Sequence, residues 1–170
     1  MKGKYRFKMP GFLLMVILIL ADRISKYLAS SILKDNDPFV IIKGVFELQY
    51  LENRGAAFGV LEGKQVFFIV LTVLIAFFCI WFFIRLPHER HFYFMELIII
   101  LLLSGAFGNF IDRVFNGYVV DFFYFSLIDF PIFNVADIYV TMAEAGLIIA
   151  VFFVYKGEDF KDIFTHSSKL

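Results

Sequence analysis

The chain has 170 residues, of which 61% are hydrophobic and 20% aromatic, and its formal net charge is zero. Soluble domains are about 45–50% apolar, so lipid must cover part of this chain. A chain without excess positive charge lacks the surface that follows phosphates, which argues against nucleic acid as a partner.

Four segments are candidates for membrane-spanning helices, which need about 20 residues each. In the first, the apolar run Phe12–Ala21 is too short, so the helix must continue through Asp22 and Lys26. These two residues are spaced i,i+4 and can pair on one helix face. Lys26 is expected to pin the helix and extend outward to the membrane surface, whereas Asp22 has either a structural role or a contact with substrate. The predicted spans are about 11–30, 66–85, 93–113 and 137–155.

The segment between the first two spans, about 36–62, predicts a small β-structure. Within it, Phe46, Leu48 and Tyr50 alternate with polar residues, which is the period of a strand. Residues 39–42 and 45–51 would form a hairpin around the two-residue turn Lys43-Gly44. The segment continues into Asn53-Arg54-Gly55-Ala56-Ala57-Phe58-Gly59, where glycine allows close backbone approach to a ligand, or where the chain simply turns toward the second span.

The third span predicts close helix packing at its polar end. Ser104 and Gly108 form a small-xxx-small pattern, which lets neighbouring helices approach. Asn109 and Asp112 then share one helical face, and Arg113 ends the span. This group is interpreted as a scaffold that orients an acidic site, with Asn109 within reach of substrate.

Two carboxylates carry the sharpest prediction of chemistry. Asp121 follows the third span and Asp137 begins the fourth, with Asn134 three residues before it. A pair of neighbouring aspartates can share a proton and activate water. Taken singly, Asp137 could be a helix N-terminal carboxylate favoured by the macrodipole, and Asp121 could be a loop acid facing water. Glu144, two helical turns after Asp137, is a candidate to support the pair.

Basic residues orient the predicted spans. The N-terminal tail, the connection 85–91 and the C-terminal tail all carry lysine or arginine and lie on one side if there are four spans. The positive-inside tendency makes that side cytoplasmic, with both termini. All the polar groups described above then converge on the outer face of the membrane, as expected for an enzyme site.

Other chemistries fit less well. One cysteine, Cys79, allows no intrachain disulfide and no cysteine-based zinc site. His88, His91 and His166 are the three histidines, all predicted on the cytoplasmic side and without an H-E-x-x-H motif. The main alternative to an enzyme is a small transporter or channel subunit with an acidic ion path, which should distribute polar residues through the membrane depth. A scaffold that binds lipidated peptides without cleaving them is a third possibility.

Five motifs in order resemble the bacterial lipoprotein signal peptidases, also called signal peptidase II. The resemblance covers residues 11–155 and departs mildly at the bulky Ile138-Tyr139, where smaller residues would be expected. The motifs are Asp22-Arg23-Ile24-Ser25-Lys26, Asn53-x-Gly55-x-Ala57-Phe58, Gly108-Asn109-x-x-Asp112-Arg113, Val120-Asp121-Phe122 and Phe133-Asn134-x-Ala136-Asp137.

The resemblance implies a membrane aspartic endopeptidase that cleaves prolipoproteins before a diacylglyceryl-modified cysteine. It implies the catalytic pair Asp121 and Asp137, and no metal or cofactor. It further implies a monomer in the bacterial cytoplasmic (inner) membrane, in contact with lipid and inhibited by the cyclic peptide globomycin. The expected fold is an all-α membrane protein of four transmembrane helices, with extracytoplasmic β-structure between the first two, in a single domain over residues 1–170. Site-supporting residues by the same resemblance are Asp22, Lys26, Asn53, Gly55, Asn109, Asp112, Arg113 and Asn134.

Overall fold

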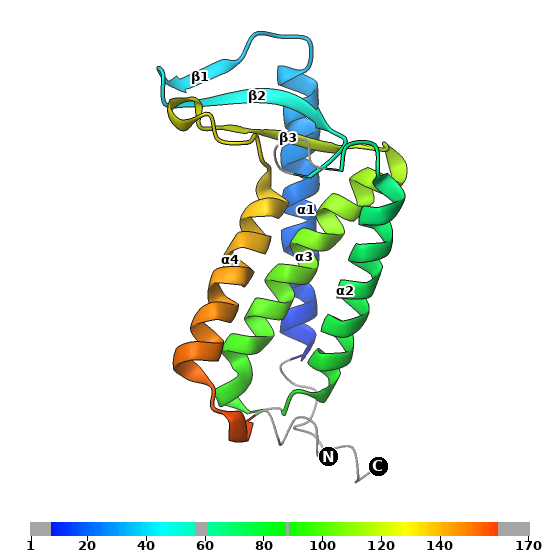
Figure 1. Ribbon diagram of the computed structural model, residues 1–170, viewed down its shortest axis with the longest axis vertical. Coiled ribbons are helices and arrows are strands. Elements are labelled where there is room, and N and C mark those ends of the chain that lie inside the picture. Colours follow the sequence, from blue (N-terminus) through cyan, green and yellow to red (C-terminus); the bar gives the residue numbers. More distant parts are fainter. Residues whose placement is uncertain (1–7, 57–60, 88, 160–170) are drawn as a thin grey trace.

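Four long helices run side by side and a small sheet lies across one end of them (Figure 1). The structure is a computed structural model that describes residues 8–56, 61–87 and 89–159. The fourth helix continues into a π-helical turn, η4 (Ala150–Val154), at the end of the bundle opposite the sheet. The helices in this described part are α1 (Lys8–Leu33), α2 (Gln65–Arg85), α3 (Tyr93–Phe115) and α4 (Val135–Ile149).

Apolar side chains cover the outside of the bundle as well as its inside. On α2 the side chains of Val66, Phe77 and Phe78 are more than half exposed, and Ala76 is the one described residue of this helix that is buried. Such a surface requires lipid. Among the described residues, three helical segments are long and apolar enough to cross a membrane: 65–85, 90–115 and 135–154. α1 has 26 residues but carries Asp22, Arg23 and Lys26, which lower its hydropathy.

The sheet confirms the predicted β-structure and adds a strand to it. β1 (Phe39–Ile42) and β2 (Phe46–Asn53) form the expected antiparallel hairpin. The predicted two-residue turn is wrong, because the loop spans three residues, with Gly44 at a φ of 70° and the Val45 N–H donating to Ile42 O at 2.9 Å. Positive φ at Gly44 is the conformation that glycine adopts without strain.

The added strand is β3 (Val119–Tyr124), which pairs antiparallel with β2 and gives the order β1-β2-β3. Asp121 lies opposite Leu51 in this ladder. The reading of Asp121 as a loop acid is therefore wrong. The strand escapes prediction because its flanking residues are uniformly apolar, without the alternation that marks a half-buried strand.

α3 occupies the middle of the bundle and contacts the other three helices. The predicted close approach is present at Gly108, where an added Cβ would lie 2.6 Å from Asp22 Oδ2 and 3.1 Å from Ala136 Cβ. Hydrogen in place of a side chain thus brings α1, α3 and the start of α4 together. This packing places the polar ends of three helices directly beneath the sheet.

Candidate active site

A cavity of about 810 Å³ opens where the sheet meets the ends of α3 and α4. Both Asp121 and Asp137 line it, together with Asn53 from β2 and Asn109 from α3. Its apolar lining includes Phe68, Val119, Phe133, Ile138, Val140 and Met142. The cavity therefore combines two carboxylates at one end with a surface that suits hydrocarbon.

Asp121 is buried, with 1% of its surface exposed. Each of its carboxylate oxygens accepts a hydrogen bond from a side-chain amide: Asn53 Nδ2 donates at 2.8 Å and Asn134 Nδ2 at 2.6 Å. Burial, first, and the nearby charge of Asp137, second, raise the pKa of Asp121 to about 7. The site thus holds this carboxyl ready to gain or lose a proton near neutral pH.

Asp137 lies in the first turn of α4, where its two oxygens are also held by hydrogen bonds. Asn109 Nδ2 donates to Oδ1 at 2.7 Å, and the Asn134 N–H donates to Oδ2 at 3.0 Å. The Asp137 N–H donates in turn to Asn134 Oδ1 at 3.1 Å, which completes a capping box with Asn134 as the N-cap. The helix begins at Val135, two residues before the predicted span, and Asp137 caps the helix as well as lining the cavity.

Asn134 contacts both carboxylates at once. Its side-chain amide donates to Asp121 while its backbone N–H donates to Asp137. Because one residue reaches both groups with its own donors, the two carboxylates are neighbours across the same cavity. The sequence placed Asn134 three residues before Asp137, but it gave no sign that Asn134 also reaches Asp121.

Beneath the pair, the buried Lys26 of α1 joins this helix to α3. Lys26 Nζ donates to Asn109 Oδ1 at 2.9 Å and forms ion pairs at 3.0 Å with both Asp22 and Asp112. The predicted Asp22–Lys26 pair is present. The expectation that Lys26 extends outward is wrong, because the residue is 1% exposed and satisfied inside the bundle. A buried ammonium persists only with such partners.

The two carboxylates paired with Lys26 each hold the backbone just before one aspartate of the site. Asp22 accepts from the Ala136 N–H at 3.0 Å, next to Asp137. Asp112 accepts from the Val120 N–H at 3.3 Å, next to Asp121. Asp22 and Asp112 are 0% exposed, so in this structure they position the chain and do not line the cavity. Arg23, which also pairs with Asp112, was quoted in a motif but not predicted as a site residue.

Gly55 and Arg113 close the cavity on the side of α2. Arg113 Nη2 donates to Gly55 O at 3.2 Å, and its guanidinium lies 4.6 Å from the ring centroid of Phe68. The Gly55 N–H donates to Asn53 Oδ1 at 2.9 Å, which fixes the amide that holds Asp121. Ala57 and Phe58 of the same predicted motif lie outside the described residues.

Glu144 is exposed and lines the cavity two turns beyond Asp137 on α4. Phe130, Pro131 and Ile132, which sequence patterns did not single out, form another wall of the cavity together with Phe133. Ile138, at the departure from the family pattern, also lines it, whereas Tyr139 is absent from the lining.

Comparisons with known proteins find relatives over most of the chain. A family model described as signal peptidase (SPase) II matches residues 14–153. Lipoprotein signal peptidases from Streptococcus pyogenes serotypes M5 (strain Manfredo) and M18 (strain MGAS8232) are each 39% identical over 150 residues, covering 88% of this chain and 95% of the relative.

Two solved structures, both described as a bacterial membrane enzyme determined by the in meso method, share the fold. The one at 2.3 Å resolution has a TM-score of 0.78 and 35% identity, and covers 100% of this chain and 98% of that chain. The one at 1.9 Å resolution has a TM-score of 0.77 and 37% identity, and covers 91% and 99%.

Proposed function

Because the chain belongs to the signal peptidase II family, the aspartic proteases that remove signal peptides from prolipoproteins, we propose that Asp121 and Asp137 are its catalytic pair. The observation that carries this proposal is the double contact of Asn134, whose donors reach one oxygen of each carboxylate. Two carboxylates held so close cannot both ionise freely, so the pair retains one proton. A pKa of about 7 at Asp121 supports a proton that is shared near neutral pH.

The reaction needs the shared proton and one water. The ionised carboxylate takes a proton from the water as its oxygen attacks the scissile carbonyl carbon. The protonated carboxyl donates to the developing oxyanion. When the carbon–nitrogen bond breaks, a carboxyl returns a proton to the leaving amine of the cysteine. The macroscopic titration belongs to the pair, so either aspartate serves as base in a given microstate.

The surrounding amides position the pair for this chemistry. Asn53, Asn109 and Asn134 donate to the carboxylate oxygens, and these donors stabilise the ionised form without neutralising it. Asp22, Lys26 and Asp112 hold the backbone beside each aspartate from below. Gly55 and Arg113 keep Asn53 in place from the side. These residues are positioning groups.

The lining of the cavity supports a lipidated substrate. A diacylglyceryl-modified cysteine would place its acyl chains along Phe68, Val140 and Met142, which line the cavity below the pair. The scissile bond would then lie at the carboxylates. The inhibitor globomycin would compete for the same cavity, and one chain contains the whole site, so a monomer suffices.

We further propose that α1 is the fourth membrane-spanning helix. Its charged residues Asp22 and Lys26 are buried against α3 and α4, so their charges do not face lipid. With four spans, the basic connection at 85–91 lies with both termini on the cytoplasmic side of the bacterial inner membrane. The sheet and the catalytic pair then lie at the extracytoplasmic face.

The test is cleavage of a diacylglyceryl-modified prolipoprotein peptide by purified protein in detergent. Asp121→Asn and Asp137→Asn should each lower kcat/KM by about a thousandfold or more, because an amide cannot act as base or acid. Asp35→Asn is the matched control, since Asp35 is exposed and does not line the cavity that contains Asp121 and Asp137. Globomycin should abolish the wild-type activity. Substantial cleavage by either site variant would contradict the assignment of the pair.

A further inference from the structure

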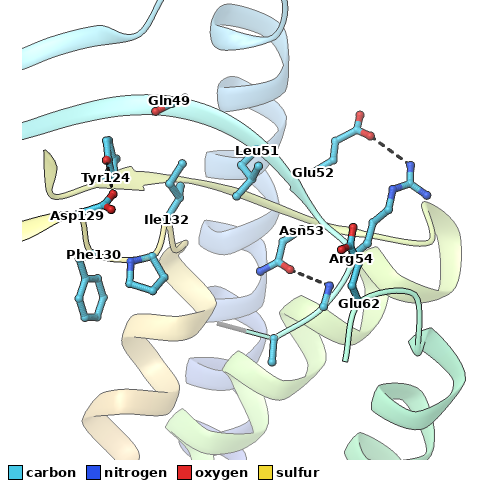
Figure 2. Close-up of a pocket in the computed structure, with 13 residues that line it drawn as sticks. Gln49, Leu51, Glu52, Asn53, Arg54, Glu62, Tyr124, Asp129, Phe130 and Ile132 are labelled. Carbon is cyan, nitrogen blue, oxygen red and sulfur yellow. Dashed lines mark hydrogen bonds and ion pairs between the residues drawn. The ribbon is translucent and has the colours of Figure 1, made fainter. Parts of the chain in front are cut away.

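The cavity that Asp121 and Asp137 line is called the catalytic cavity below. A second cavity, of about 480 Å³, lies on its outer side and is called the outer cavity. It lies between β2, the end of β3 and the loop 129–132 (Figure 2). Six residues line both cavities, so the two cavities adjoin each other beside Asn53, which donates to Asp121. The six residues are Asn53, Gly55, Ala56, Phe130, Pro131 and Ile132.

The lining of the outer cavity differs in character from that of the catalytic cavity. Figure 2 shows Asp129 beside Tyr124 at one end, and Arg54 and Glu62 at the other, with apolar side chains between. Three carboxylates, those of Glu52, Glu62 and Asp129, line it against one guanidinium. The outer cavity is thus polar at its ends and negative on balance.

Two of these carboxylates are not neutralised locally. Glu52 is paired with Lys34 at 3.1 Å and with Arg54 at 3.4 Å. Asp129 accepts from the Tyr124 hydroxyl at 2.7 Å, which is a neutral donor. Neither Asp129 nor Glu62 forms an ion pair with any residue that the structure describes. Both residues are exposed, so they add negative charge at the rim of the outer cavity.

We infer that the outer cavity binds the first residues of the mature polypeptide, those that follow the modified cysteine, and that it favours basic side chains there. This inference rests on the proposed function. A substrate bound across the pair extends in two directions from its scissile bond, and the apolar catalytic cavity suits the acyl chains. The polypeptide beyond the cysteine needs a polar route out of the site, and the adjoining outer cavity offers such a route. Complementary charge would give this segment specificity.

The experiment compares two diacylglyceryl-modified peptides with lysine or glutamate at the second and third residues after the cysteine. Cleavage is measured in neutral detergent at low ionic strength, so that neither membrane charge nor salt contributes. Wild-type protein should prefer the lysine peptide by about tenfold in kcat/KM, the size expected for two exposed charge contacts. The preference should shrink at high salt.

The double variant Glu62→Gln/Asp129→Asn should lower that preference to about twofold or less. Asparagine accepts from Tyr124 and tolerates the left-handed conformation of Asp129, whose φ is 48°, so the loop keeps its shape. Asp37→Asn, exposed and outside the cavity lining, is the control that should keep the preference. Equal cleavage of both peptides by wild-type protein, an unchanged preference in the double variant, or its loss in the control would each overturn the inference while the proposed function stands. Cleavage of neither peptide would overturn both.

Discussion

At the scale of single residues, the raised pKa of Asp121 makes the stability of the folded protein depend on pH. Burial and the charge of Asp137 raise its pKa from 3.8 to about 7, so between these pH values the folded protein holds a proton that the unfolded chain releases. The contribution of Asp121 to the free energy of unfolding is therefore fully present below about pH 4 and is lost as the pH rises through about 7.

Asp121→Asn removes this dependence. We expect the Tm of wild-type protein, measured in detergent micelles, to fall relative to that of the variant by about 5 °C or more between pH 5 and pH 8. The comparison between proteins cancels pH effects of other groups. A Tm difference that stays constant across this range would show that Asp121 is not titrating there.

The resemblance to signal peptidase II and the position of charged groups beside apolar segments predicted the polar residues of the proposed site. They did not predict the roles. Asp22 and Asp112 hold the backbone at Ala136 and Val120, and Asn134 bridges both aspartates. These contacts join residues up to 114 positions apart, and no local pattern encodes which donor meets which acceptor.

At the scale of elements, the helices were predictable and their assembly was not. Hydrophobic length alone located α2, α3 and α4 within a few residues. β3 was missed because a strand buried on both faces has no alternating pattern. That strand carries Asp121, so the geometry of the site depends on a strand that the sequence did not reveal.

Gly108 tests the packing that joins these elements. Gly108→Ala would place a Cβ 2.6 Å from Asp22 Oδ2 and 3.1 Å from Ala136 Cβ, which must displace Asp22 or the start of α4. We expect a loss of about 1–3 kcal/mol in stability and a loss of about tenfold or more in kcat/KM, because Asp137 moves with Ala136. Gly157→Ala, where an added Cβ meets nothing within 4 Å, is the control. Wild-type activity in Gly108→Ala would show that the helices tolerate separation at this point.

At the scale of the whole molecule, polar function is concentrated at one end of the bundle. Asp121, Asp137, their amide donors and the outer cavity all lie at or beneath the sheet, which lies across one end of the four helices (Figure 1). Five elements, α1, β2, α3, β3 and α4 with its N-cap, supply the two aspartates and the residues that hold them. An ion path would instead require polar groups through the membrane depth, so this distribution fits proteolysis at one face.

The proposed orientation makes that polarity testable in cells. Lys43 lies in the hairpin turn of the sheet, and Glu89 lies in the connection at the opposite end of the bundle; Glu89 is exposed. In a Cys79→Ala background, Lys43→Cys should react with a membrane-impermeant maleimide added to intact spheroplasts. Glu89→Cys should react only after lysis, because in intact spheroplasts the bilayer separates this residue from the reagent. The sheet and the connection that contains Glu89 lie at opposite ends of the helix bundle. The reverse labelling pattern would therefore place the proposed catalytic pair on the cytoplasmic side and would contradict the orientation expected from the basic residues.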